Sequence, residues 1–426
     1  MERYNEYKQS GISWLPEIPA GWEEKRLATH FHGRVEANTD FEYKHAFRFN
    51  YGTVVHKNEV GDLEAYRDVY VKYTKVIKDD ILINGLNLNY DFVSQRVAIV
   101  PESGIVTSAY VVLRPFETTF APYFCYLFKA MDSQKLFHGM GTGIRLTLSF
   151  DELKRQIVPI PSLAEQKKIV AYLDKRVSLI ESLKEQKELE LQTLNELKQS
   201  EIASAVTKGI DPNVQMKDSG FSWIGLIPAH WKVKTLRAYL SLVSEKNHPD
   251  ATLLSVTREQ GVIVRDTESK EENHNFIPDD LSGYKYVKSG QFVINKMKAW
   301  QGSYGVSLYD GIVSPAYYVC DLDFPNKTYF SMAIRSKTYV DFFARWSKGI
   351  RVGQWDLEPI ALKSVPFLEP PIKEQTAIVE YINSKTAKID TMIESLRAEI
   401  ERLTEYKQRL ISDVVTGQIN VQDEII

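Results

Sequence analysis

Two long stretches of the chain carry apolar residues at helical spacing, with charged residues filling the gaps. The first begins at Pro161 and contains neither Gly nor another Pro before Gly209. Ser162 is a favourable N-cap, and with Glu165 three residues later it predicts a capping box. The apolar positions that follow are Ile169, Leu173, Val177, Ile180, Leu183, Leu191, Leu194, Ile202 and Val206. This pattern predicts one helix of about 45 residues, roughly 65–70 Å long.

The second stretch opens in the same way, with Glu374 and Gln375 in the places of Glu165 and Gln166. Seven-residue spacing is typical of helices that pack along their length. Two series of apolar residues in this stretch have that spacing. The first is Ile389, Leu396, Leu403 and Leu410, and the second is Ile393, Ile400 and Val414, with Lys407 in place of an apolar residue. A helix this long needs a partner, so we expect the two to pack on each other.

The chain is a tandem duplication. Residues 10–14 and 219–223 both have the pattern Ser-Gly-x-Ser-Trp, and Ile-Pro-Ala-x-Trp follows at 18–22 and 227–231. The two patterns lie 209 positions apart, as do the two helix openings. Such self-similarity indicates a structural unit that occurs twice, here a globular segment followed by a long helix.

Matched blocks inside the globular segments have the composition of β-strands. Ile81–Asn84 corresponds to Phe292–Asn295, and Gly104–Tyr110 corresponds to Gly311–Tyr317. These blocks are β-branched and aromatic and are bounded by Gly, Asp or Asn, which predicts strands of an α+β domain. We predict further helices at 120–135 and 329–347.

The segments between the matched blocks differ almost completely. Residues 41–80 do not resemble residues 250–289, and residues 85–103 do not resemble residues 296–310. A shared scaffold with two different sets of loops indicates two related surfaces that bind two different targets.

Composition argues only weakly for or against particular classes of function. The formal net charge is -3, whereas a free-standing nucleic-acid binder usually carries a basic excess. The two cysteines, Cys125 and Cys320, lie in apolar runs, so we expect buried thiols rather than a disulfide. Because no apolar run reaches transmembrane length and the N-terminus does not resemble a signal peptide, we expect a cytoplasmic protein.

The sequence lacks the motifs of the enzymes that act on DNA. It has no Gly-x-x-x-x-Gly-Lys-Ser/Thr phosphate loop and no Asn/Asp-Pro-Pro-aromatic segment of the kind that holds a flipped adenine. His30 and His32 have no convincing further ligands nearby, so we interpret them as strand or loop surface. We therefore predict no catalytic residue and no metal site.

Candidate DNA-contacting residues lie in loops that interrupt the strands. Lysine suits phosphate contacts, glutamine, asparagine and arginine suit base edges, and aromatic rings suit stacking. The candidates are Asn87, Asn89, Tyr90, Arg96, Arg145, Lys296, Lys298, Trp300, Gln301, Lys348, Arg351 and Gln354. Structural alternatives stay open: Trp300 as a packing residue, the asparagines as turn formers, and Arg145 and Arg351 as partners of carboxylates. The tryptophans at 14, 22, 223 and 231 we interpret as scaffold.

With the duplication, the Pro-x-x-x-Glu-Gln helix openings and the Gly-Ile-Arg turns at 143–145 and 349–351, the chain resembles the specificity subunit of a type I restriction-modification system. The resemblance covers essentially the whole chain. The segments Asn-Lys-Met-Lys-Ala-Trp-Gln-Gly at 295–302 and Gly-Ile-Val-Ser-Pro-Ala-Tyr at 311–317 are specific features of it.

The resemblance implies two tandem target recognition domains at 1–160 and 210–369, each followed by a spacer helix, at 161–209 and 370–417, with a C-terminal tail at 418–426. The helices would pack as an antiparallel coiled coil with pseudo-two-fold symmetry. Each domain would recognise one half of a bipartite, asymmetric site in double-stranded DNA. Two modification subunits (adenine-N6 methyltransferases) would dock on equivalent faces, and two restriction subunits would add translocation and cleavage. S-adenosylmethionine, ATP and Mg²⁺ would bind those partners and not this chain.

Two other classes stay open from the residues alone. A DNA methyltransferase with its own recognition domain requires a cofactor motif that the sequence lacks. A coiled-coil scaffold without a DNA role would explain the helices, but it gives no reason for the loops to differ between matched strands. A system that only methylates, without a restriction subunit, is also compatible with the sequence.

Overall fold

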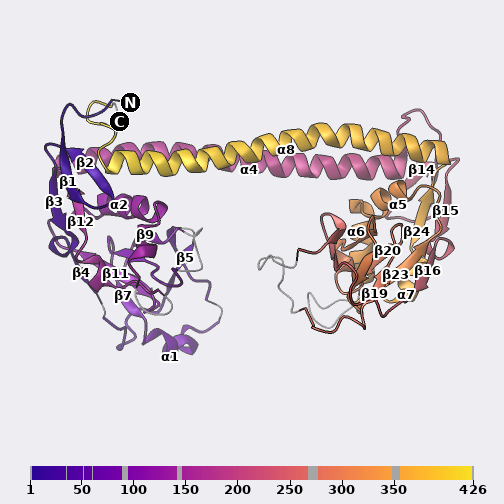
Figure 1. Cartoon of the computed structure of the whole chain (residues 1–426), viewed down its shortest axis with the longest axis horizontal. Helices are drawn as coiled ribbons and strands as arrows, with labels where there is room; N and C mark the ends of the chain where they lie inside the picture. Colours follow the sequence, from indigo (N-terminus) through magenta and orange to yellow (C-terminus); the bar gives the residue numbers. More distant parts are fainter. Residues whose placement is uncertain are drawn as a thin grey trace. The chain divides into compact units, whose positions relative to one another are not determined.

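The computed structural model describes residues 2–34, 36–50, 52–59, 61–88, 95–141, 146–266, 277–347 and 356–424. The chain divides into two compact units. Unit 1 comprises Met1–Glu188 and Ala398–Ile426, and unit 2 comprises Leu189–Arg397. Each unit contains one globular α+β domain and parts of both long helices, α4 (Leu163–Lys208) and α8 (Ile372–Val415) (Figure 1). Both long helices are thus confirmed. The units divide each helix in two, and the predicted limits of the individual domains stay a prediction.

Unit 1 is built from short strands and few helices. Its strands are β1 (Tyr7–Ile12), β2 (Leu15–Pro19), β3 (Glu23–Arg26), β4 (Phe31–Gly33), β5 (Phe47–Asn50), β6 (Thr53–His56), β7 (Thr74–Val76), β8 (Ile81–Ile83), β9 (Val97–Ile99), β10 (Gly104–Val106), β11 (Val111–Pro115) and β12 (Ile157–Ile160). Its shorter helices are α1 (Arg67–Tyr70), α2 (Ala121–Ser133) and α3 (Phe150–Leu153).

Unit 2 repeats this inventory. Its strands are β13 (Met216–Asp218), β14 (Leu226–Pro228), β15 (Lys232–Thr235), β16 (Leu240–Val243), β17 (Leu254–Thr257), β18 (Gly261–Val264), β19 (Lys285–Val287), β20 (Phe292–Asn295), β21 (Tyr304–Val306), β22 (Gly311–Val313), β23 (Tyr317–Leu322) and β24 (Pro366–Glu369). Its shorter helices are α5 (Lys327–Ile334), α6 (Lys337–Trp346) and α7 (Pro359–Ser364).

The two domains share one sheet plan. A four-stranded antiparallel sheet has the order β4-β11-β8-β9 in unit 1 and β16-β23-β20-β21 in unit 2. Each smaller pair also has a counterpart: β1–β2 matches β13–β14, β3–β12 matches β15–β24, β5–β6 matches β17–β18, and β7–β10 matches β19–β22. The duplication seen in the sequence is therefore a duplication of the fold.

The tryptophans closest to the helices anchor each domain. Trp22 and Trp231 are 2% and 1% exposed, and each belongs to the main apolar core of its unit. The main-chain oxygens of both accept a hydrogen bond from a lysine of the first strand, Lys8 for Trp22 and Lys217 for Trp231. Burial of a large indole removes much apolar surface from water, so these residues stabilise the scaffold, as their repetition predicts.

The start of α4 differs in one respect from the predicted capping box. The Ser162 hydroxyl accepts a hydrogen bond from the main-chain N–H of Glu165 at 3.3 Å, as an N-cap should. The Glu165 carboxylate, however, accepts hydrogen bonds from the Tyr4 hydroxyl at 2.7 Å and the Trp22 indole at 2.9 Å. Glu165 therefore connects the helix to the domain instead of completing a local cap.

The single helix predicted at 329–347 is wrong, because the structure has two helices there, α5 and α6. Ser336 separates them in an extended conformation (ψ 154°), which interrupts the helical hydrogen bonding. The guanidinium of the preceding Arg335 donates to the main-chain oxygens of Arg258 and Glu259 in the β17–β18 hairpin. A tertiary contact thus stabilises a break that apolar spacing does not indicate.

Helices α4 and α8 pack antiparallel within each unit. Polar contacts join them, among them Glu181 to Lys407 and Lys187 to Glu399 in unit 1, and Lys198 to Asp390 and Glu201 to Tyr381 in unit 2. As the residue number on α4 rises, the number of the contacting residue on α8 falls, so the two helices run antiparallel. Lys407, which interrupts the heptads, is itself buried and is neutralised by Glu181.

The segment after α8 is part of the domain of unit 1. Gly417 turns the chain with φ +75°, and the main-chain N–H of Asn420 bonds the oxygen of Glu2 at 2.8 Å. Val421 is fully buried, and Lys168 donates to the main-chain oxygen of Gln422. Residues expected as a tail therefore hold the two ends of the chain together over the start of α4.

Candidate nucleic-acid interface

Hydrogen bonds of the main chain hold the loop after β20, which contains Lys296 and Lys298, in a defined conformation. The buried Asn295 side chain accepts from the main-chain N–H of Met297 at 3.2 Å, and its main-chain oxygen accepts from Lys298 at 3.0 Å. A short turn of helix, Ala299–Gln301, follows and ends at Gly302, whose φ of +90° favours glycine. Lys298 is therefore exposed, as its candidate role requires.

The other candidates in this loop are less open to solvent. Lys296 is half-buried and forms an ion pair with Asp356 at 2.8 Å, and this hydrogen bond and charge raise the pKa of Lys296. Trp300 and Gln301 are also half-buried. The loop thus has one exposed cation, Lys298, and one lysine, Lys296, that is paired with a carboxylate.

The equivalent loop after β8 is organised by an arginine. The Arg96 guanidinium donates to the main-chain oxygens of Asn84 at 3.0 Å, Leu86 at 2.7 Å and Asn87 at 3.4 Å, and the residue is only 1% exposed. The Arg96 side chain is therefore enclosed and holds the loop in place, and its expected contact with DNA stays a prediction. Asn87 stays exposed and adopts φ +53°, a left-handed conformation that asparagine tolerates well.

Six candidates lie outside the described residues: Asn89, Tyr90, Arg145, Lys348, Arg351 and Gln354. Their contribution to the site stays a prediction. Within the described part of the chain, the loops after β8 and β20 contain the other candidates.

Sequence analysis missed a cationic side chain next to the β20 loop. The Lys285 amine, on β19, donates to the main-chain oxygen of Tyr317 at 2.5 Å and lies 5.9 Å from the centre of the Tyr318 ring. Burial and the charges of Lys246 and Lys296 lower the pKa of Lys285. The residues are far apart in sequence, so only the sheet register reveals that they meet.

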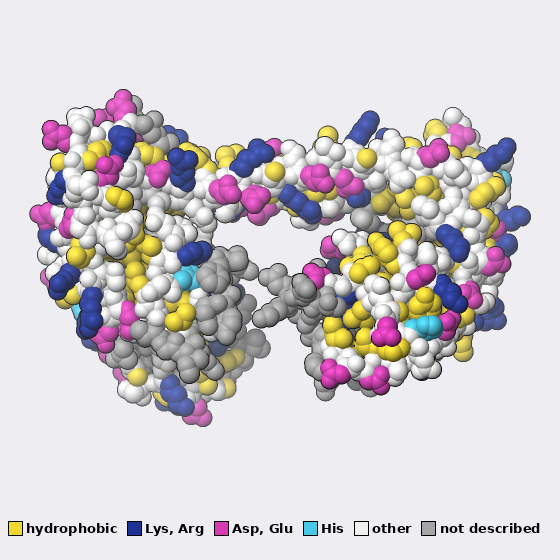
Figure 2. Space-filling model, in the orientation of Figure 1, with side chains coloured by type: hydrophobic (Ala, Val, Ile, Leu, Met, Phe, Trp, Pro, Cys, Tyr) yellow, Lys and Arg dark blue, Asp and Glu magenta, His cyan; other side chains and the backbone are white. Residues whose placement is uncertain are grey.

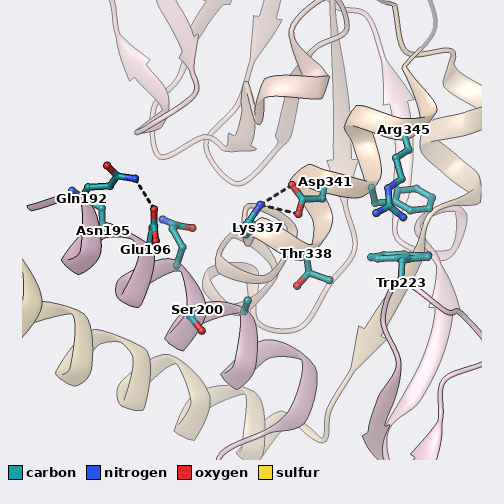
Figure 3. A pocket seen from close by; sticks show the side chains of 12 residues that line it. Gln192, Asn195, Glu196, Ser200, Trp223, Lys337, Thr338, Asp341 and Arg345 are labelled. Carbon is teal, nitrogen blue, oxygen red and sulfur yellow. Dashed lines mark hydrogen bonds and ion pairs between the residues drawn. The ribbon is translucent and has the colours of Figure 1, made fainter. Parts of the chain in front are cut away.

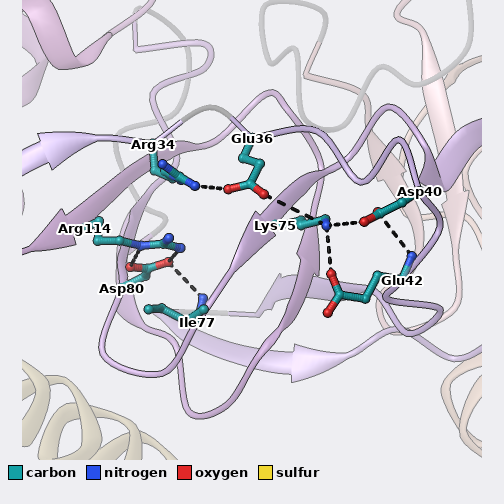
Figure 4. Close-up of polar contacts among 8 residues, drawn as sticks. All are labelled: Arg34, Glu36, Asp40, Glu42, Lys75, Ile77, Asp80 and Arg114. Atoms are coloured by element: carbon teal, nitrogen blue, oxygen red, sulfur yellow. Dashed lines mark hydrogen bonds and ion pairs between the residues drawn. The ribbon is translucent and has the colours of Figure 1, made fainter.

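Charges are arranged differently in the domain of unit 1. The Lys75 amine lies 2.8 Å from carboxylate oxygens of both Asp40 and Glu42, and 4.0 Å from Glu36 (Figure 4). Arg114 forms two hydrogen bonds with the fully buried Asp80, which in turn accepts from the main chain at Ile77. These cations are neutralised within the domain.

A groove of about 800 Å³ lies in unit 2 between α4 and α6. Lys337 and Asp341 of α6 form an ion pair on one wall, and Trp223 faces the side chain of Arg345 at one end (Figure 3). The α4 wall is polar and includes Gln192, Asn195, Glu196, Gln199 and Ser200. The lining has no buried acid–base pair of the kind that catalysis needs.

Other chemistry is sparse in the described part of the chain. There, no group of three or more His, Cys, Asp or Glu residues is arranged to hold a metal ion. Both cysteines are free and buried, as expected, and burial raises the pKa of each thiol, that of Cys320 to about 12. No described helix is both long and apolar enough to cross a lipid bilayer.

The fold comprises two related domains, each of which accompanies part of one pair of long helices. Residues 20–193 match the family model of the type I restriction modification DNA specificity domain. The chain is 24% identical to the type I restriction enzyme MjaVIII specificity subunit of Methanocaldococcus jannaschii, covering 83% of each chain. It is also 24% identical to the EcoKI specificity subunit of Escherichia coli K12, over 73% of this chain and 68% of that one.

A solved structure, described as the structural basis of complex assembly and conformational transition of the type I R-M system, has the same fold. Its TM-score is 0.65 at 13% identity, with 94% of this chain and 99% of that chain covered. The family model over residues 20–193 and the curated relatives indicate that the chain is a specificity subunit of a type I restriction-modification system.

Proposed function

We propose that the chain recognises a bipartite, asymmetric DNA site, with each domain contacting one half. The observation that carries this proposal is a repeated scaffold with unlike loops. The loop after β20 exposes Lys298, whereas the equivalent loop after β8 exposes Asn87 and encloses Arg96. Loops of different chemistry on one sheet plan are what two different half-sites require.

In this proposal the paired helices set the spacing of the half-sites. Helices α4 and α8 have 46 and 44 residues and are joined by ion pairs and apolar contacts along their length. A spacer of this kind predicts half-sites that lie about one helical turn apart. Unspecified bases separate them.

The helices also supply docking faces for two modification subunits. Leu183 and Met392 occupy equivalent positions in the two repeats, and both are exposed, at 47% and 57%. Leu197 and Tyr406 form a second equivalent pair that is exposed. Figure 2 shows hydrophobic side chains among the charged ones along the helices. Repeated apolar positions that stay in solvent favour two copies of one partner, one for each repeat.

The chemistry then belongs to the partners. The modification subunits bind S-adenosylmethionine and methylate adenine, and two restriction subunits add cleavage with ATP and Mg²⁺. This chain is the non-catalytic subunit that selects the site. Its net charge of -3 is compatible with this role, because the partners close around the duplex and contribute further phosphate contacts.

Methylation mapping tests the proposal. The chain is co-expressed with its modification subunit, and the host genome is sequenced by a method that detects N6-methyladenine. Cells that express the modification subunit alone are the control. We expect a split motif with two different halves, methylated on opposite strands, only when both proteins are present.

The alternatives make different predictions. If the purified chain methylates DNA without a partner, it is itself a methyltransferase. If a complex with the modification subunit forms but neither methylates DNA nor prefers any sequence in competition, the coiled-coil scaffold is correct and the recognition role is wrong.

A further inference from the structure

Two lysines of unit 2, Lys246 and Lys285, lie close enough for the charge of one to act on the other. The main-chain N–H of Tyr286 bonds the oxygen of Glu245 at 2.8 Å, and the two residues form an antiparallel bridge. In an antiparallel ladder the next pair outward is Lys246 opposite Lys285, with both side chains on the same face. Like charges in directly opposed positions destabilise a sheet, so this pair needs an explanation outside the isolated fold.

Nearby carboxylates do not neutralise this pair. Among the described residues, neither Lys246 nor Lys285 forms an ion pair, while the neighbouring Glu245 is paired with Lys288 at 2.9 Å and with His248 at 3.0 Å. Burial together with the charges of Lys246 and Lys296 lowers the pKa of Lys285, which is the effect of a cluster of cations. Lysines that repel one another are positioned for a ligand with several negative charges.

The cluster adjoins the loop that carries the candidate residues. Lys296 begins that loop directly after β20, and Asn295 pairs with Tyr317 on β23. The Lys285 amine bonds the oxygen of this same Tyr317, and the Tyr318 ring lies beside it. Asp356 pairs with Lys296, whereas no carboxylate of the described residues forms an ion pair with Lys246 or Lys285. Lys285 and the two tyrosines thus lie beside the start of the loop that contains Lys296 and Lys298.

The equivalent positions in unit 1 are neutral. Thr74 opposes Val106 as Lys285 opposes Val313, so Thr74 is the counterpart of Lys285. Ala37 bridges Thr74 and occupies the place of Lys246. The scaffold itself therefore does not require lysine at either position.

We propose that Lys246 and Lys285 bind phosphates of the DNA backbone beside the half-site contacted by the second domain, a contact that the first domain lacks. This inference rests on the proposed function and assigns part of the DNA affinity to named residues. Phosphate contacts position the duplex and contribute affinity without sequence preference. The pair therefore orients the second half-site against the loop that contains Lys298.

The test uses the complete complex with modification subunits and measures DNA affinity over a series of KCl concentrations. Two duplexes are compared, one with the mapped site and one without it. In the double variant K246Q/K285Q we expect weaker binding to both duplexes and a slope of log K against log salt that is smaller by about 2. The preference for the specific duplex stays unchanged.

Three further variants serve as controls and as a milder test. K288Q removes the same charge from a lysine already paired with Glu245, and it should leave the slope nearly unchanged. K246R/K285R keeps both charges and should keep the wild-type slope. K246Q alone alters an exposed side chain that cannot disrupt the core, and it should lower the slope by about 1.

The outcomes separate this inference from the proposed function. If the wild-type complex binds the site but K246Q and the double variant keep its slope, the phosphate assignment is overturned. If the double variant loses only the specific preference, the lysines contact bases and the assignment is again overturned. If the wild-type complex itself shows no preference for any sequence, the proposed function fails first.

Discussion

The indole N–H of Trp22 donates a hydrogen bond to the Glu165 carboxylate at 2.9 Å, which joins the core of the first domain to the first turn of α4. The second repeat has the same residues, Trp231 and Glu374, without this bond. There the Glu374 carboxylate is bonded to His230 at 2.7 Å, and the buried Trp231 indole N–H has no hydrogen-bond partner among the described residues. The duplicated junctions therefore differ in how helix and domain are coupled.

Replacing the two tryptophans by phenylalanine should have unequal costs. Both side chains are almost completely buried, so the loss of apolar contact is similar. Trp22→Phe also removes a hydrogen bond to a charged group, and we expect it to lower the free energy of unfolding by about 1–2 kcal/mol more than Trp231→Phe. Scanning calorimetry of the two variants measures the difference. Equal losses would mean that the Glu165 bond contributes nothing.

The ion pair between Lys407 and Glu181 should make the helix pairing in unit 1 pH-dependent. Burial opposes ionisation of Glu181, but the hydrogen bond and charge of Lys407 outweigh it and hold the pKa of Glu181 below its ordinary value. A carboxyl with a lowered pKa stabilises the fold above its ordinary pKa, and this contribution is lost as the pH falls through the lowered value.

We therefore expect Glu181→Gln to lower stability at neutral pH by about 1 kcal/mol, since the carboxylate is partly exposed and solvent screens it. The difference from the wild-type protein should begin to shrink as the pH falls below about 4.3, the ordinary pKa of Glu, and should vanish at still lower pH. Thermal melting followed by circular dichroism over this range measures it. A difference that does not change between neutral and strongly acidic pH would contradict an electrostatic origin.

Lys298→Ala should weaken recognition without affecting folding. The side chain is exposed, so the melting temperature should not change. Loss of a phosphate contact should weaken DNA binding by the complex and lower its salt slope by about 1. Methylation at the half-site of the second domain should slow, and Lys337→Ala, which alters an exposed lysine of α6, is the control. If Lys298→Ala unfolds the protein, its role is structural.

Single substitutions at exposed apolar positions of the helices should each weaken the binding of one modification subunit. Leu183→Glu in unit 1 and Met392→Glu in unit 2 each place a charge on an exposed apolar position. We expect each substitution to weaken the binding of one modification subunit at least about tenfold. The double variant should bind both modification subunits weakly. Native mass spectrometry counts the subunits. Leu226→Glu, at an equally exposed leucine on β14, should leave the assembly intact.

Neither cysteine should react while the protein is folded. Both are buried, and burial raises the pKa of Cys320 to about 12, so almost no thiolate exists at neutral pH. We expect no colour with an aromatic disulfide reagent under native conditions and two thiols per chain in denaturant. Rapid reaction of a native thiol would indicate that the surrounding core opens readily.

Much of the fold is predictable from local patterns. The two long helices, the strands at 81–84 and 292–295 and the helix at 120–135 all follow from apolar spacing and turn residues over short windows. The break at Ser336 does not, because it depends on Arg335 reaching the distant β17–β18 hairpin. The enclosure of Arg96 does not follow from the sequence either, since a guanidinium that binds three main-chain oxygens of the neighbouring loop resembles, in sequence, one that binds DNA.

The sequence by itself determined the duplication, the length and ends of both helices, the buried tryptophans and the family resemblance, because these depend on residue type and spacing along the chain. Only the tertiary structure decided which polar groups meet. It paired Glu165 with Trp22, enclosed Arg96 and brought the charge of Lys246 close to Lys285. The physical reason is that a charge is neutralised, buried or left for a ligand according to neighbours that strand register and helix packing bring together from distant parts of the chain.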